Sequence, residues 1–268
     1  MNKTHHVRFD YNPRLRALSS AGERCLHTAE VTGSIPVAPT PGRLVDLIRS
    51  LLFLVLISAC GGFTPPKGAD HLSVYYELPV ARLLDGLEIA PEHRSGYQRD
   101  LFPHWSDEDG DGCDTRREVL IRDARSDLLF SDFDNCRIRS GVWYSPYDDV
   151  WWEGSPVGLH IDHLVPLQEA WDSGAHAWDA SRRQTYANDL SGLVIATAAA
   201  NKEKGGDDPH RWMPANPNHH CPYLAGWIAV KARWTLSIDP QEAQFLRHQL
   251  KTRCQGLTVK ISSNSSFT

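Results

Sequence analysis

Apolar and polar positions along the second half of the chain predict a mixture of helices and strands. Near the C-terminus the apolar residues recur at the spacing of a helix with one buried face. Short apolar runs bounded by turn-forming residues predict strands instead. The predicted helices span 181–188, 198–204, 223–234 and 240–250, and the predicted strands span 159–167 and 193–197. No internal repeat is visible, so this pattern predicts a single α+β domain.

The first quarter of the chain has a different pattern. Residues 1–42 show neither helical nor strand periodicity, and we expect them to be disordered or to precede the true start of the protein. Residues 43–60 combine a basic start, nine apolar or small residues at 51–59 and then Cys60, which are the parts of an export signal. The apolar run is about half as long as a membrane-spanning helix. The segment resembles a bacterial lipobox, which implies lipidation of Cys60; ordinary signal cleavage nearby is the alternative.

With either alternative we expect the protein to be exported: as a cell-surface lipoprotein if Cys60 is lipidated, or as a secreted protein if the signal is cleaved in the ordinary way. We expect a tether over 61–78 because these residues are mainly Gly, Pro and polar. The folded domain is predicted over 79–257, and a flexible tail over 258–268. Contact with a membrane is expected through the lipid anchor only.

Four cysteines remain after the signal: Cys113, Cys136, Cys221 and Cys254. An even number in an exported protein favours two disulfides, for which three pairings are open. We favour the sequential pairing, Cys113 with Cys136 and Cys221 with Cys254. A zinc site is the competing use of four cysteines, but the chain has no C-x-x-C pair.

The residues suited to chemistry concentrate between 159 and 205. Asp162 and His163 are adjacent in the first predicted strand, and Asn188 precedes the second strand. The helix that follows carries N-x-x-K-G, from Asn201 to Gly205. Strand, loop, strand and helix bring these polar groups to one place. The sequence here resembles the HNH, or His-Me finger, endonucleases, whose ββα-metal core carries D-H on the first strand and N-x-x-K-G on the helix.

The resemblance extends from about residue 101 to residue 254. It is strongest to an exported actinobacterial branch related to the C-terminal HNH domain of modification-dependent restriction enzymes. The further segments that carry it are 109–116, 140–143, 172–175 and Pro209 with Trp212. The resemblance implies a single domain built around a ββα-metal core, with extra C-terminal helices and two disulfides. It also implies a metal-dependent endonuclease that hydrolyses the phosphodiester bonds of DNA.

The chemistry of hydrolysis suits the residues of the motif. His163 is the candidate general base, because a neutral imidazole accepts a proton near pH 7. Asp162 and Asn201 supply oxygen ligands of the kind that Mg²⁺ prefers, with Mn²⁺ and Zn²⁺ as alternatives. Lys204 and Arg116 are candidates to bind phosphate oxygens, Arg116 through its two-pronged guanidinium.

The resemblance also implies a residue that orients the imidazole of the base. Asn188 is the nearest match to it. In many members of the family this Asn directly precedes the second strand, where the present chain has Gly192. Asp189 is therefore the fallback for the same role.

Net charge limits how the protein binds its substrate. The chain has 28 Lys and Arg against 33 Asp and Glu, a formal net charge of −5. Such a balance argues against coating of nucleic acid through a basic surface. We expect weak, largely sequence-independent binding of nucleic acid, DNA rather than RNA, by a monomer.

A second constellation of carboxylates lies upstream. Asp107, Asp109 and Asp111 alternate before Gly112, and Glu118 follows, which matches the oxygen positions and the glycine of an EF-hand calcium loop. A structural Ca²⁺ is expected if this loop binds; a solvated acidic turn is the alternative.

Two other functions compete with the nuclease. A non-catalytic, calcium-binding surface module stapled by disulfides needs none of the Asp162, His163 and Asn201 set. A zinc hydrolase is suggested by His160-x-Asp162-His163, part of the H-x-H-x-D-H signature of the metallo-β-lactamase fold. Gly158 stands where that signature requires its first His, which counts against the zinc hydrolase.

Overall fold

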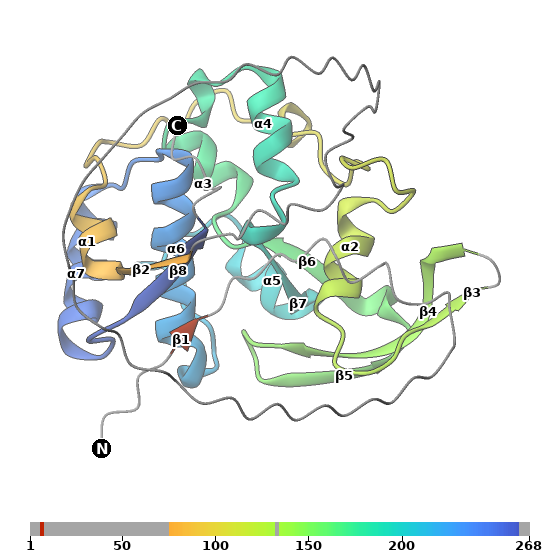
Figure 1. The fold of residues 1–268 in the computed structure, drawn as a ribbon. Helices are drawn as coiled ribbons and strands as arrows, with labels where there is room; N and C mark the ends of the chain where they lie inside the picture. Colours follow the sequence, from red (N-terminus) through yellow and green to blue (C-terminus); the bar gives the residue numbers. More distant parts are fainter. Residues whose placement is uncertain (1–5, 8–74, 132–133, 263–268) are drawn as a thin grey trace, which may run out of the picture. The chain divides into compact units, whose positions relative to one another are not determined.

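The computed structural model describes residues 6–7, 75–131 and 134–262 (Figure 1). The export signal, Cys60 and most of the predicted tether lie outside these residues. The strands are β1 (His6–Val7), β2 (Tyr75–Pro79), β3 (Leu129–Ser131), β4 (Asp134–Ser145), β5 (Val150–Gly154), β6 (Leu159–His163), β7 (Leu193–Thr197) and β8 (Thr258–Ser262). The α-helices are α1 (Val80–Asp85), α2 (Thr115–Arg122), α3 (Leu167–Asp172), α4 (Ala180–Ala187), α5 (Ala198–Lys204), α6 (His220–Trp234) and α7 (Pro240–Thr252).

Helices and strands mix in one domain, as the hydrophobic pattern predicts. The four predicted helices correspond to α4, α5, α6 and α7, and the second predicted strand is β7. The first predicted strand is too long, because β6 ends at His163 and α3 already begins at Leu167. Pro166 stands directly before α3, where a residue without an N–H closes a strand and opens a helix.

The strands form three small sheets rather than one. Their orders are β1-β8-β2, β3-β4-β5 and β6-β7. Strands β2 and β8 run antiparallel and bring the two ends of the domain together. Residues 75–78 and 258–262 were predicted to belong to the tether and to the tail, and this pairing corrects both boundaries. Residues 258–262 belong to the domain because β8 carries an apolar side chain, that of Val259, into the main core.

Two apolar clusters flank the β6-β7 pair. The larger cluster includes Trp227 and Ile228 of α6 and Leu246 of α7. The smaller cluster joins α2, β4, β6 and β7 around the fully buried Trp143. Figure 1 shows β6 and β7 between the C-terminal helices and the β3-β4-β5 sheet. The pair that carries the chemical motif is therefore built into the core.

Two disulfides tie loops to these elements. Cys113 bonds Cys136, which joins the segment before α2 to β4, and Cys221 bonds Cys254, which joins the start of α6 to the segment after α7. The sequential pairing is therefore confirmed. A native disulfide of this kind stabilises a domain by about 2–4 kcal/mol.

Candidate functional site

The motif residues meet where α5 packs on β6. His160 and Asp162 lie two residues apart, so they share one face of β6. Asn201 and Lys204 lie three residues apart and share one face of α5. The amide Nδ2 of Asn201 lies 3.3 Å from Nδ1 of His160, and Nζ of Lys204 lies 2.7 Å from Oδ2 of Asp162. The spacing of the motif therefore matches one helix face to one strand face.

The N-terminus of α5 is fixed by its capping residue. Oγ1 of Thr197 accepts a hydrogen bond from the backbone N–H of Ala200 and donates one to Asp148 in the β4-β5 turn. At the other end, Gly205 adopts a φ of 55°, a conformation that favours glycine. These two ends set the position of Asn201 in the middle of the helix.

Asp162 is buried and strongly held. Its Oδ2 accepts hydrogen bonds from the Tyr147 hydroxyl and from Nζ of Lys204, each at 2.7 Å. Both bonds use the same oxygen, so Oδ1 is the oxygen that remains for a ligand among the described residues. The sequence offered no signal for Tyr147, whose burial and neighbouring carboxylate raise its pKa well above the usual value.

Lys204 has a different task from the one predicted. Its side chain is completely buried, and Nζ donates to the His163 carbonyl at 2.8 Å as well as to Asp162. Burial lowers its pKa, although the carboxylate of Asp162 opposes this shift. An ammonium enclosed in this way fixes Asp162 and the end of β6. The structure gives Lys204 this positioning contact in place of the expected contact with phosphate.

The imidazole of His163 is oriented by a main-chain carbonyl. Nε2 donates to the carbonyl oxygen of Ala187 at 2.9 Å, which leaves Nδ1 as the basic nitrogen. Burial lowers the pKa of His163 to about 3, so the ring is neutral at physiological pH. The rings of Trp105 and Tyr186 flank it, with centroids at 5.9 and 6.4 Å.

Asn188 contributes to this orientation indirectly. Its side chain is buried and bonds the neighbouring loops: Nδ2 donates to the carbonyls of Pro103 and Gln184, and Oδ1 accepts from the Ser106 N–H and the Thr115 hydroxyl. The predicted bond from Asn188 to His163 is thus made by the carbonyl of the preceding residue, Ala187.

The fallback residue, Asp189, is also engaged elsewhere. Its carboxylate accepts hydrogen bonds from Ser191 and from the indole of Trp234, and it pairs with Arg233. It holds the turn before β7 against the end of α6.

Arg116 lies at the other end of β6. Its Nη2 donates to the carbonyl of Leu159 at 2.9 Å and to that of Pro156 at 3.3 Å. Burial lowers its pKa. These bonds attach α2 to the start of β6, whereas the chemistry of the guanidinium had predicted contact with phosphate.

A cavity of about 230 Å³ opens over the motif. Asp162, His163 and Asn201 all line it, so the structure brings together the three residues proposed as ligands and base. Tyr97, Arg99 and Lys202 line it as well and were missed. Residues 93–105 mix His, Arg, Tyr and Trp, which is a signal for nucleic-acid contact that the sequence did carry.

The acidic loop forms in part. Carboxylate oxygens of Asp107, Asp109 and Asp111 lie within 4.8 Å of one another and are exposed. Glu118 is not a member of this group; it lies in the first turn of α2. The chain before Asp107 has no α-helix between α1 and α2 within the described residues, so the helix that opens an EF-hand is lacking.

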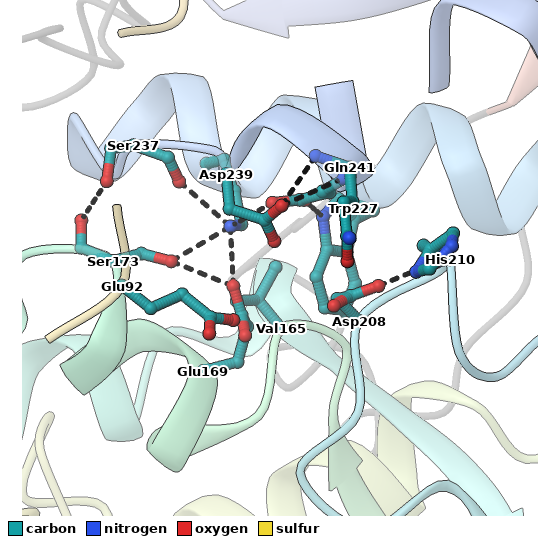
Figure 2. Close-up of polar contacts among 12 residues, drawn as sticks. Glu92, Val165, Glu169, Ser173, Asp208, His210, Trp227, Ser237, Asp239 and Gln241 are labelled. Atoms are coloured by element: carbon teal, nitrogen blue, oxygen red, sulfur yellow. Dashed lines mark hydrogen bonds and ion pairs between the residues drawn. The ribbon is translucent and has the colours of Figure 1, made fainter. Parts of the chain in front are cut away.

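A pair of glutamates surrounds a buried lysine, Lys231, which is not among the residues that line the cavity. Nζ of Lys231 lies 2.7 Å from Glu169 Oε1 and 2.9 Å from Glu242 Oε2, and also bonds Ser173 and Ser237. Figure 2 shows the side chains of Glu169 and Ser173 and the main-chain carbonyl of Ser237 converging on one nitrogen atom. These bonds join α3 to α6 and α7, so the network supports the core.

Carboxylates near Lys231 also converge among themselves. Oxygens of Glu92, Asp208 and Asp239 lie within 4.8 Å of one another. Asp239 caps α7 by accepting from Gln241, and Asp208 accepts from the N–H of His210 (Figure 2). Within the described part of the chain, no group of three or more converging His, Cys, Asp or Glu ligand atoms includes a histidine. Among those residues, the geometry therefore offers no histidine-rich zinc site of the kind that a zinc hydrolase uses.

Comparisons with known proteins show which family and which relative the chain is similar to. The family described as "GmrSD restriction endonucleases, C-terminal domain" matches residues 114–249, just over half of the chain. An uncharacterized secreted protein of Arthroderma benhamiae is 40% identical over 173 residues, which cover 63% of this chain and 82% of the relative. No solved structure matches the chain. In the part of the chain that the structure describes, no helix has the length and hydropathy to cross a membrane.

Proposed function

Because the chain belongs to the family of GmrSD restriction endonuclease C-terminal domains, we propose that it is a metal-dependent endonuclease that hydrolyses phosphodiester bonds of DNA. The observation that carries this proposal is the convergence of Asp162, His163 and Asn201 on one cavity. We further propose that β6, β7 and α5 are the ββα-metal core of a His-Me finger. Two antiparallel strands followed by a helix are the elements that such a core requires.

The residues present fit a hard divalent cation. Asp162 offers Oδ1, because its other oxygen is occupied by Tyr147 and Lys204. Asn201 offers its amide oxygen, because Nδ2 is turned toward His160. Oxygen ligands of this type suit Mg²⁺ or Mn²⁺. When bound, such an ion would neutralise charge on the phosphate and make a nearby water more acidic.

His163 supplies the base. Its neutral ring presents Nδ1 while Nε2 stays bonded to Ala187, so the tautomer is set before substrate arrives. A water oxygen attacks phosphorus, and the proton of that water passes to Nδ1 of His163. The bond from phosphorus to the 3′ oxygen breaks, and the leaving oxygen takes a proton from solvent. The products are a 5′-phosphate and a 3′-hydroxyl.

Plasmid cleavage tests the proposal. Purified protein is expected to nick supercoiled plasmid with Mg²⁺ and to stop when EDTA is added. His163→Ala abolishes nicking, whereas His248→Ala, which changes an exposed histidine on α7, leaves it intact. Intact cleavage by folded His163→Ala contradicts the assignment of the base.

Metal binding gives a readout that does not depend on cleavage. We expect Mn²⁺ to bind the wild-type protein in a calorimetric titration and to bind Asp162→Asn or Asn201→Ala at least tenfold more weakly. Equal Mn²⁺ affinity in the wild type and both variants would show that the ion is held elsewhere. A protein that binds Mn²⁺ only at Asp107, Asp109 and Asp111, and cleaves nothing, matches the alternative of a calcium-binding module. Whether calcium binds this loop is decided by the same titration with Ca²⁺.

Export is also proposed. The name of the fungal relative calls that protein secreted, and the two disulfides suit an oxidising environment. Lipid attachment at Cys60 remains a prediction, which mass spectrometry of the membrane fraction tests.

A further inference from the structure

We propose that Arg99 binds the phosphate that occupies the cavity, in the role that the sequence analysis assigned to Arg116 and Lys204. This inference rests on the nuclease function proposed above and names the residue that holds its substrate. Arg99 precedes residues 114–249, so it lies outside the part of the chain that matches the family.

A phosphate in this cavity needs a cation that is free to reach it. Lys204 is enclosed and already bonded to Asp162 and to the His163 carbonyl. Arg116 is bonded to two carbonyls at the start of β6. Two other cationic side chains line the cavity, Arg99 and Lys202, and both are exposed.

Arg99 is the better placed of these two. Its Nη2 lies 3.4 Å from Nε2 of His104. His104 is able to accept this bond because its Nδ1 donates to the Phe102 carbonyl at 2.8 Å. The His104 ring in turn lies 6.3 Å from the ring of His163. The guanidinium is therefore held on the cavity wall beside the proposed base, whereas Lys202 is an ammonium on α5 whose charge acts on His160.

The segment that carries Arg99 is firmly attached to the domain. Phe102 is completely buried, and the carbonyl of Leu101 accepts a hydrogen bond from Nε of Arg183 at 3.0 Å. One residue further along, the carbonyl of Pro103 accepts from Nδ2 of Asn188. These contacts, at the last residue of the short 3-10 turn Arg99–Leu101 and directly after it, give Arg99 a defined position. Asn188 is thus connected to the segment of Arg99, although it does not contact His163.

The chemistry of guanidinium suits the role. It carries five N–H donors in a planar fork; His104 and the Tyr97 hydroxyl each take one of them, so N–H groups remain for two phosphate oxygens. A fixed positive charge in a chain of net charge −5 supplies the local attraction that the surface as a whole does not. Arg99 thus holds the phosphate from its own segment, while Asp162 on β6 and Asn201 on α5 line the same cavity.

Binding of a dinucleotide tests this contact without cleavage. Labelled dithymidylate with one ordinary phosphodiester is compared with its uncharged methylphosphonate analogue, in EDTA and with Ca²⁺. We expect the wild-type protein to prefer the charged form about tenfold, and Arg99→Ala to lose this preference. Arg99→Lys keeps the charge but not the fork and is expected to retain part of it. An undiminished preference in Arg99→Ala overturns the proposal.

Cleavage of a minimal substrate shows which phosphate Arg99 contacts. For both plasmid DNA and bis(p-nitrophenyl) phosphate, Arg99→Ala is expected to lower kcat/KM about 10- to 100-fold. Arg94→Ala is the matched control, because it is an exposed arginine of the same segment that does not line the cavity. A loss with DNA but not with the small diester means that Arg99 contacts a distant phosphate, and the proposal fails.

The two proposals fail in different ways. If His163→Ala abolishes cleavage but Arg99→Ala changes neither binding nor cleavage, the nuclease stands and the Arg99 contact is wrong. If the wild-type protein cleaves nothing, yet prefers the charged dinucleotide and Arg99→Ala does not, the phosphate site stands and the nuclease assignment is wrong.

Discussion

Replacing Lys204 by methionine separates the role seen in the structure from the role expected from the motif. Methionine has a similar length and no charge, so it fills the same space between α5 and β6. The change removes the two bonds of Nζ, to Oδ2 of Asp162 and to the His163 carbonyl. The carboxylate of Asp162 is then left buried with Tyr147 as its remaining partner.

The size of the effect follows from this burial. The side chain of Lys204 is 0% exposed and that of Asp162 is 7% exposed, so solvent screens the pair weakly. Removing one partner of a buried pair costs about 3–5 kcal/mol, chiefly because the other charge stays buried. In a domain of this size each kcal/mol lowers Tm by about 2–4 °C, so Lys204→Met is expected to lower it by roughly 6–20 °C. Asp162 then loses the ammonium that holds its carboxylate in place, and metal-dependent cleavage falls with it.

Circular dichroism melts and plasmid cleavage measure the two consequences separately. Lys251→Met changes an exposed lysine in the last turn of α7 and serves as the matched control, within about 0.5 kcal/mol of wild type. Adding Asp162→Asn to Lys204→Met removes the orphaned charge, so the double variant is expected to recover much of the lost Tm. It does not recover cleavage.

One result refutes this reasoning. If Lys204→Met melts within about 2 °C of wild type while its KM for DNA rises and kcat holds, Lys204 reaches the substrate. The motif lysine is then a phosphate ligand, as the sequence had predicted, and the buried pair of Lys204 and Asp162 does not stabilise the fold.

Three further predictions concern the scaffold. Changing Cys113 and Cys136 to alanine costs about 2–5 kcal/mol in denaturant unfolding, and wild type under reducing conditions shows a loss of the same sign. Burial and neighbouring carboxylates raise the pKa of Asp172 from 3.8 to about 6, so the folded protein loses stability as pH rises through this range. Asp172→Asn is therefore expected to have a higher Tm than wild type above pH 6 and the same Tm near pH 4. Asp127→Asn, which changes an exposed aspartate, is the control. Asn188→Ala leaves several buried groups without partners and is expected to cost about 1–3 kcal/mol, which urea unfolding measures.

The elements that carry the motif were predictable because their signals are local. Residues 193–197 form a short apolar run, and Thr197 is a good N-cap for the helix that follows. Counting cysteines in an exported chain predicted two disulfides but left three pairings open, and the structure shows the sequential pairing that we favoured. The ends of the domain were not predictable in the same way, since β2 and β8 pair across almost the whole domain, and no local pattern reports a partner so distant.

The site was predictable in its residue types but not in its contacts. Asp162, His163 and Asn201 line one cavity, as the motif indicates. Which cation reaches that cavity depends on burial, and a sequence pattern does not distinguish a buried lysine from an exposed one. Arg116 and Lys204 were given to phosphate because their charge suits it, whereas the fold uses both charges to bind parts of β6.

The distance of three residues between Asn201 and Lys204 explains why both belong to the site. One helical turn places the amide against His160 and the ammonium against Asp162, so a single face of α5 sets both proposed metal ligands. A lysine that reached out to phosphate would leave the buried carboxylate of Asp162 without its cationic partner, at a cost comparable to a large part of the stability of a domain. The substrate must then be held by a cation from another part of the chain. Arg99, on a segment that Asn188 fastens to the rim of the cavity, is the residue that meets this requirement.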